Sequence, residues 1–295
     1  MHKRRLLLSL LTLLVTLTLV LVGTGCSRMR IAYQTADFFV DRHVNDYLQL
    51  DRSQRQQWAP LRKTALAAHR EEELPYLAAF FDSARDGAVN GFTRAGMTCL
   101  LDQFETIYQR HMRLIIGALA PVLAGLERDQ IDALAARFEQ EAQKDAANTG
   151  PAAAARRARK RAERYESNMG WWIGDLTSNQ LDILGDLTAA MPDTAPAWNA
   201  YRDRKRQELT ALLRQQASAA ALERFLRGWL IDLDDLPPDL AGIDAIMREH
   251  MTELFLRLGP SFSPAQRARF VDRLTTLRDD FLALQTQPRM AARGC

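Results

Sequence analysis

The sequence has few valines after its first 25 residues, and this shortage limits the folds that it can form. Only five valines follow that segment, whereas alanine, leucine, arginine, glutamine and glutamate are abundant. Because β-branched residues favour strands and the abundant residues favour helices, little material for a sheet remains. The shortage excludes a β-rich fold and predicts an all-α protein.

Several residue patterns that would indicate an enzyme are also absent. Four of the five histidines follow residue 25, and none lies in a recognisable nucleophile or zinc-binding pattern. Glycine occurs only 15 times, and no glycine-rich phosphate-binding loop is present. We therefore predict that the protein is not an enzyme and that it holds no cofactor or metal.

An excess of charge is missing as well once the first segment is set aside. The formal net charge of +3 equals the contribution of the three basic residues at positions 3–5. The rest of the chain is formally neutral, so we expect no nucleic-acid partner and no general attraction to anionic lipid. Over the whole sequence, the apolar fraction of 47% and the charged fraction of 25% are typical of a globular protein.

The first 26 residues have the pattern of an exported bacterial lipoprotein. Basic residues at positions 3–5 precede an apolar run over residues 6–22, and small residues then lead to Cys26. In such a segment the basic residues stay on the cytoplasmic side, the apolar run crosses the membrane, and the small residues admit a peptidase. We predict a signal peptide over residues 1–25 and lipid attachment at Cys26. Gly23 departs from the usual aliphatic residue, and a retained membrane anchor is the alternative.

The residue after the cysteine bears on where such a lipoprotein goes. Ser27, rather than an aspartate, follows Cys26, and by analogy with other bacterial lipoproteins this indicates the outer membrane, with the protein facing the periplasm. The predicted membrane partner is then outer-membrane lipid, contacted through the acylated cysteine. In this oxidising compartment Cys99 and Cys295 could pair. We favour a buried, unreactive thiol for Cys99, because it lies in an apolar run, and a bridge is the alternative.

Apolar residues recur at helical spacing through the rest of the chain. In the last long segment, steps of four and three residues join Phe270, Leu274, Leu277, Phe281 and Leu284. Glycine and proline predict breaks near residues 86–87, 149–151, 191–192, 237–238 and 259–260. We expect a bundle of about eight to ten helices, with kinks at two early prolines, Pro60 and Pro75.

Four of the expected helices begin with the same local pattern. Each start has an apolar residue, a capping residue, two further residues and a glutamine, which is the pattern of a capping box. In a capping box the side chain of the cap accepts a hydrogen bond from the third helical amide, and the glutamine accepts one from the amide of the cap. The four boxes run from Asp51 to Gln54, Glu127 to Gln130, Thr177 to Gln180 and Ser263 to Gln266.

The spacing of these boxes suggests a repeated plan. The first and third are offset by 126 residues and the second and fourth by 136, with similar short segments between them. We interpret this as a tandem duplication that produced two pseudo-symmetric helical halves, residues 26–149 and 150–287. A short tail, residues 288–295, is expected to be flexible.

Two resemblances follow from these motifs. Leu176–Gln180 resembles the LTxxQ motif of small, all-helical periplasmic stress chaperones, which dimerise into a cradle; the other three boxes depart from that motif. Over its whole length the chain is more similar to an uncharacterised family of proteobacterial lipoproteins with a domain of unknown function, marked by residues 46–54 and 69–75. That second resemblance implies no catalytic residues.

Three charged segments are candidate sites. His69, Glu72 and Glu73 share a helical face and could ligate a metal, but we favour a solvated, ion-paired face for them and for residues 41–46. We also favour a solvated face for the densest basic run, and we keep it with the two tryptophans beyond it as the candidate binding patch. This patch comprises Arg156, Arg157, Arg159, Lys160, Arg161, Arg164, Trp171 and Trp172.

Taken together, these patterns predict a lipid-anchored helical protein that binds other proteins, in the manner of a chaperone. A structural or assembly component of an envelope complex is the main alternative. An enzyme whose site includes His69 and the glutamates beside it is the least favoured.

Overall fold

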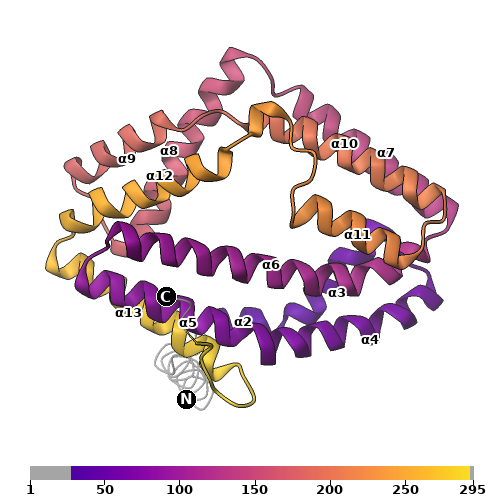
Figure 1. The fold of residues 1–295 in the computed structure, drawn as a ribbon, viewed down its shortest axis with the longest axis horizontal. Coiled ribbons are helices and arrows are strands. Elements are labelled where there is room, and N and C mark those ends of the chain that lie inside the picture. Colours follow the sequence, from indigo (N-terminus) through magenta and orange to yellow (C-terminus); the bar gives the residue numbers. More distant parts are fainter. Residues whose placement is uncertain (1–27, 293–295) are drawn as a thin grey trace, which may run out of the picture.

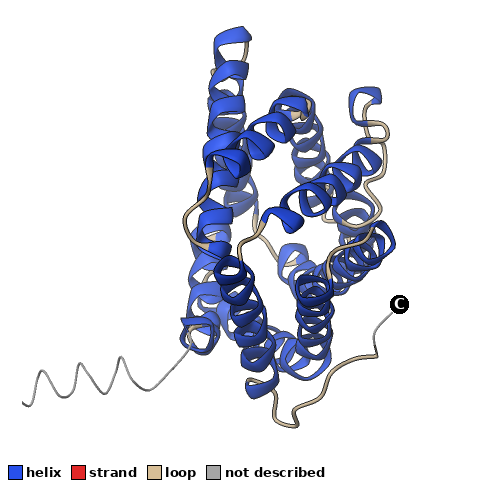
Figure 2. Ribbon diagram, turned by 90° about the vertical axis from the view of Figure 1, so that its left-hand side faces the viewer, coloured by secondary structure: helices blue, strands red, loops and turns tan. Residues whose placement is uncertain are grey.

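The computed structural model describes residues 28–292, and every regular element within that range is a helix (Figures 1 and 2). The prediction of an all-α fold is therefore confirmed. The first half contains α2 (Arg28–Gln34), α3 (Ala36–Leu48), α4 (Arg52–Ala68), the π-helical turn η1 (His69–Glu73), α5 (Leu74–Asn90), α6 (Arg94–Ala124) and α7 (Arg128–Ala146).

The second half continues with helices of similar length. Its elements are α8 (Pro151–Ile173), α9 (Ser178–Ala190), α10 (Ala195–Arg214), α11 (Ala219–Leu230), η2 (Pro238–Leu240), α12 (Ile243–Leu258), η3 (Gly259–Ser261) and α13 (Pro264–Ala283). No helix among the described residues is long and apolar enough to span a bilayer. The predicted signal peptide and Cys26 lie outside the described residues.

The structure has more helices than the eight to ten expected, because some breaks carry no strong sequence signal. The breaks near residues 150, 192, 238 and 260 are confirmed, but the one at residues 86–87 is wrong: α5 runs on to Asn90. It ends at Gly91, whose positive φ of 93° suits a residue without a side chain.

A π-helical turn joins α4 and α5 just before Pro75. The amide of Leu74 donates to the carbonyl of His69, five residues back, as a π turn requires. Pro75 has no amide to donate to the carbonyl of Glu71, and the guanidinium of Arg289 donates to that carbonyl instead, at 2.9 Å. The irregularity expected at Pro75 is therefore a widened turn whose free carbonyl is satisfied by the C-terminal segment.

The two halves exchange helices instead of packing separately. In the first half α4, η1 and α5 follow one another without a gap, and α5 packs against α13 of the second half. Reciprocally, α10 of the second half packs against α7 of the first half. These reciprocal pairs lie at opposite ends of the molecule, and α6 packs against both α11 and α12 between them (Figure 1). The arrangement is what two subunits of a domain-exchanged dimer would form, and the duplication stays a prediction.

The two largest hydrophobic clusters combine residues from both halves, whereas the cluster of Tyr201, Leu240 and Ile243 belongs to the second half alone. One cluster joins the buried Trp58 and Ile116 to Leu222, and a second joins Leu100 to Leu184 and Phe270. Both clusters therefore include side chains from each half. The residue 149/150 boundary thus marks a turn between α7 and α8 but does not separate two cores.

The C-terminal segment is held against the π-helical turn. The amide of Ala291 donates to the carbonyl of Pro75 at 3.0 Å, and the amide of Arg289 donates to the side chain of Gln285 at 2.9 Å. As far as residue 292 the tail has hydrogen-bond partners at and near the turn, and the flexibility expected of residues 288–295 stays a prediction.

Cys99 takes part in a disulfide, so the preference for an unreactive free thiol at this position is wrong. Its apolar sequence neighbours concealed that its own side chain is only half-buried. The two other cysteines of the chain, Cys26 and Cys295, both lie outside the described residues.

Candidate functional site

All four predicted capping boxes are formed. In each box the glutamine Oε1 accepts a hydrogen bond from the backbone amide of the cap residue, at 2.9 to 3.0 Å. The cap residues are those expected: Asp51, Glu127, Thr177 and Ser263. Each glutamine side chain is thereby held in a fixed orientation at the start of its helix.

The structure brings the first two boxes together through their glutamines. Gln54 Nε2 donates to Gln130 Oε1 at 2.8 Å, and Gln130 Nε2 donates back to Gln54 Oε1 at 2.7 Å. The second proton of each amide goes to a backbone carbonyl, that of Gly125 for Gln54 and that of Gln49 for Gln130. Each amide therefore uses both donors and both acceptor positions.

The third and fourth boxes pair in the same way in the other half. Gln180 and Gln266 exchange hydrogen bonds of 2.9 and 3.0 Å, and their remaining protons go to the carbonyls of Ser261 and Asp175. Gln180 is fully buried. Each pair joins the starts of two helices within its own half, α4 to α7 and α9 to α13. The pairs therefore have a structural role and offer no free polar group to a ligand.

The basic run of the candidate patch lies on α8, and part of it is occupied by contacts within the chain. Arg157 forms an ion pair with Asp193, and Arg161 donates to the carbonyls of Met191 and Pro192. These contacts hold the turn between α9 and α10 against α8. The other basic side chains of the run, at positions 156, 159, 160 and 164, are exposed.

The two tryptophans lie near the C-terminal end of α8, and at 1.5 Å per residue Trp171 is about 10 Å along the helix from Arg164 and about 15 Å from Arg161. Trp172 packs into the core with its ring edge against Phe270, at a centroid distance of 5.5 Å. Trp171 is 49% exposed and lies under the guanidinium of Arg273 at 4.0 Å. The structure therefore does not join the basic run and the tryptophans into one patch.

His69 meets a second histidine that the sequence gave no reason to place there. His69 Nε2 lies 2.8 Å from His111 Nε2 on α6, and His69 Nδ1 lies 2.9 Å from the hydroxyl of Tyr33 on α2. His111 Nδ1 lies 2.6 Å from the carbonyl of Ile107. Because that carbonyl only accepts, His111 carries its proton on Nδ1, His69 donates from Nε2, and Tyr33 donates to His69.

This chain of hydrogen bonds is satisfied by two neutral imidazoles. Burial, reinforced by the neighbouring His111, lowers the pKa of His69 to about 4. A metal would need further ligands, and the described residues contain no group of three or more histidine, cysteine, aspartate or glutamate side chains that could hold one. The glutamates do not supply them: Glu73 is buried in a two-bonded pair with Arg110, and Glu72 is exposed.

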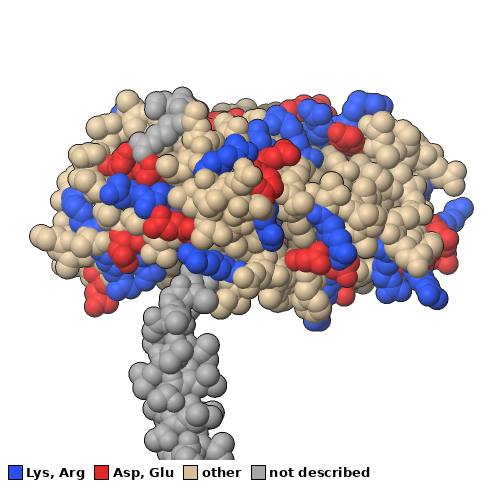
Figure 3. Space-filling model, turned by 90° about the horizontal axis from the view of Figure 1, so that it is seen from below, with Lys and Arg blue, Asp and Glu red and all other residues tan. Residues whose placement is uncertain are grey.

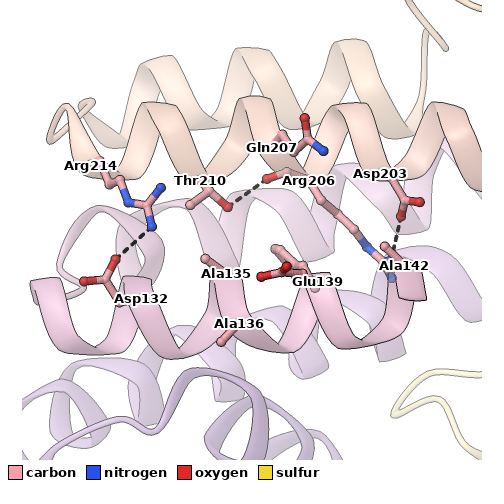
Figure 4. Close-up of a pocket in the computed structure, with 11 residues that line it drawn as sticks. Asp132, Ala135, Ala136, Glu139, Ala142, Asp203, Arg206, Gln207, Thr210 and Arg214 are labelled. Carbon is pink, nitrogen blue, oxygen red and sulfur yellow. Dashed lines mark hydrogen bonds and ion pairs between the residues drawn. The ribbon is translucent and has the colours of Figure 1, made fainter. Parts of the chain in front are cut away.

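A polar hollow lies between α7 and α10, with a volume of about 520 Å³ (Figure 4). Four of its five charged side chains form ion pairs, Arg214 with Asp132 at 2.8 Å and Arg206 with Asp203 at 3.3 Å, and the fifth, Glu139, is exposed. These pairs already satisfy the charges that a polar ligand would need. We therefore interpret the hollow as a polar packing interface between α7 and α10 and not as a binding site.

A second hollow, between α3, α4 and α6, is almost entirely apolar. We call it the α3–α6 groove; its volume is about 570 Å³, and its lining includes Phe39, Val44, Trp58, Leu66, Ile115 and Leu119. At its edge Phe39 is 59% and Ile115 44% exposed. The indole N–H of Trp58 is buried without a hydrogen-bond partner among the described residues.

Part of the charged segment at residues 41–46 lies at the α3–α6 groove. Asp41 and Asp37 both pair with the guanidinium of Arg62, which lies 10% exposed beside the groove. His43 lines the groove, whereas Asp46 points to solvent beside Arg42. Sequence reasoning missed the groove, although the consecutive Phe38, Phe39 and Val40 place apolar side chains on more than one face of α3, which was an available signal.

Comparison with curated proteins found no match to this chain, and comparison with solved structures found none either. Residues 46–239 match a family of unknown function, DUF6279. The matched range includes both paired histidines, most of the α3–α6 groove and three of the four capping boxes. Because the match covers more than half of the sequence, the chain belongs to the DUF6279 family.

Proposed function

We propose that this protein is a lipoprotein, anchored through Cys26 to the outer membrane and facing the periplasm, that binds apolar segments of other proteins in the α3–α6 groove. The observation that carries this proposal is the groove itself. Its walls are apolar over nearly their whole area, and exposed side chains such as Phe39 and Ile115 stand at its rim. Exposed apolar surface of this kind is typical of binding sites.

Further features support a holding role over a catalytic one. The groove brings together no nucleophile with a base, and its one buried cation, Arg62, is paired to two carboxylates. The unpaired N–H of Trp58 would gain a partner from a backbone carbonyl of a bound segment after a small movement. The chaperone-like activity suggested by the motif at Leu176–Gln180 fits a site that accepts apolar segments.

The proposal is tested by placing a charge at the rim of the groove. Ile115→Glu should leave folding intact, because the side chain is 44% exposed, but it should remove suppression of aggregation of an unfolded client such as reduced α-lactalbumin. Ile246→Glu on α12 is the matched control, since Ile246 is 43% exposed and lies outside the groove. Light scattering with equimolar acylated protein measures the effect.

The outcome separates the two kinds of binding protein. If the unmodified protein does not suppress aggregation, a chaperone-like role is ruled out. If crosslinking in the envelope instead recovers one stoichiometric partner, and Ile115→Glu abolishes that crosslink, the groove serves a fixed envelope complex. Equal behaviour of the two glutamate variants would remove the groove from the proposal.

A further inference from the structure

The outer face of α2 and α3 carries large apolar side chains that nothing in the described part of the chain covers. Ile31 is 54% exposed and Phe38 61%. The backbone continues from α2 into α3, since the amides of Thr35 and Phe39 donate to the carbonyls four residues before them, each at 3.2 Å. Thr35, between the two helices, departs from α-helical geometry with a ψ of −1°, but these hydrogen bonds keep positions 31, 35 and 38 at near-helical spacing along one stripe.

The opposite face of α2 is fixed to the body of the protein. Met29 and Tyr33 pack into a cluster with the buried Leu74 and Phe281. Arg30 forms an ion pair of 2.8 Å with Asp280 of α13, whose side chain is 2% exposed. Because α2 is held on this side, the stripe with Ile31 and Phe38 faces away from the body.

We propose that this stripe lies in the headgroup region of the membrane that holds Cys26, while the neighbouring Phe39 stays at the rim of the α3–α6 groove. The inference rests on the lipid attachment stated under the proposed function, and it adds a second, non-covalent contact with the same membrane. The occupant of the apolar stripe is thus membrane lipid.

The position of the stripe in the chain favours this occupant. Cys26 precedes the start of α2 at Arg28 by two residues, which span at most about 7 Å. From Arg28 to Phe38 the helices rise by at most about 15 Å. The Cα atom of Phe38 is therefore within about 22 Å of the acylated residue, and that of Ile31 within about 12 Å. An apolar stripe so near an acyl anchor meets lipid before it meets any soluble partner.

The charges on this segment are already balanced. Arg62 pairs with the two acidic residues of α3 at positions 37 and 41, and Asp46 lies 3.6 Å from Arg42. The underside of the molecule shows basic and acidic side chains intermixed, with no broad field of one sign (Figure 3). The contact should therefore depend on apolar burial and not on anionic lipid.

Photocrosslinking of the full-length, acylated protein in vesicles tests the inference. The photoreactive residue p-benzoylphenylalanine replaces Phe38 in one variant and Ile246, an exposed apolar position on α12, in the control. Vesicles of phosphatidylcholine alone are compared with vesicles of phosphatidylethanolamine and phosphatidylglycerol. Mass spectrometry then measures covalent lipid adducts at each position.

We expect several-fold more lipid adduct at position 38 than at position 246, to the same extent in both kinds of vesicle. Equal adducts at the two positions would overturn the inference, as would adducts at position 38 to a second protein copy. Protein that floats with the vesicles and carries the acyl group, yet gives no adduct at position 38, contradicts only the inference. Protein that lacks the acyl group and does not float removes the lipid anchor and the inference together.

Discussion

The four paired glutamines explain why the same residue type recurs at the end of every capping box. Glutamate serves equally well in an isolated box, because only an acceptor is needed there. Here each side chain must also donate twice, to the partner glutamine and to a carbonyl, and a carboxylate has no proton to give. The repeated choice of glutamine was a signal in the sequence that the boxes meet in pairs.

Gln180→Glu should therefore destabilise the protein by about 2–4 kcal/mol, because it places a buried carboxylate against the carbonyl of Ser261 and Oε1 of Gln266. Urea denaturation at pH 7 measures the free energy of unfolding. Gln207→Glu, at an exposed position of α10, should change it by less than about 0.5 kcal/mol. Equal small effects would show that the pairing contributes little.

We expect the free energy of unfolding to decrease at acid pH because of His69. The pKa of His69 is lowered to about 4 in the folded protein, so between that pH and its unfolded value near 6.5 the unfolded chain binds more protons. The contribution of His69 to the free energy of unfolding is complete above about pH 6.5 and declines as the pH falls towards 4. From pH 7 to pH 5 the loss is about 2 kcal/mol.

His69→Gln should reduce this decline, because glutamine does not titrate. The free energy of unfolding, measured by urea denaturation at both pH values, tests it. His43→Gln, at an exposed position, is the control and should retain the pH dependence of the unmodified protein. An unchanged slope in His69→Gln would place the acid sensitivity elsewhere.

At the scale of elements, local signals located most helix starts, whereas long-range contacts decided which helices dock. The capping boxes and the prolines near residues 192 and 238 act within a few residues, so they were readable. The attachment of α2 depends on Arg30 reaching Asp280, 250 residues away in the sequence. No local pattern predicts such a pair.

Arg30→Met should loosen α2 by removing the partner of a buried carboxylate, at a cost of roughly 1–3 kcal/mol to the docking of this helix. Hydrogen exchange should become faster in residues 28–34 and stay unchanged in α6. Arg42→Met, whose side chain is 68% exposed, should alter neither region. Faster exchange throughout the protein would mean that α2 unfolds together with the whole chain.

At the scale of the whole molecule, the exchanged helices make the two halves depend on each other. Residues 26–149 expressed alone would expose the surface of α5 that α13 covers and the surface of α7 that α10 covers. We expect neither half alone to unfold cooperatively, as measured by circular dichroism during thermal denaturation, because each core is completed by the other half.

A protease site inserted at Gly150 gives the complementary experiment. Residues 149 and 150 are exposed in the turn between α7 and α8, so cleavage there should leave the two fragments associated and folded. Separation of the fragments on size exclusion without denaturant would contradict this dependence. Independent folding of either half would contradict it as well.

The sequence by itself determined the all-α fold, the four capped helix starts and the formal neutrality of the chain after residue 25, because each depends on composition or on residues a few positions apart. Only the tertiary structure decided that the glutamines pair, that His69 meets His111, that Cys99 is bonded and that the α3–α6 groove exists. The glutamine pairs, the histidine pair and the groove join side chains that are tens of residues apart. Their formation depends on how several helices pack together, and that packing is set by the whole apolar surface at once.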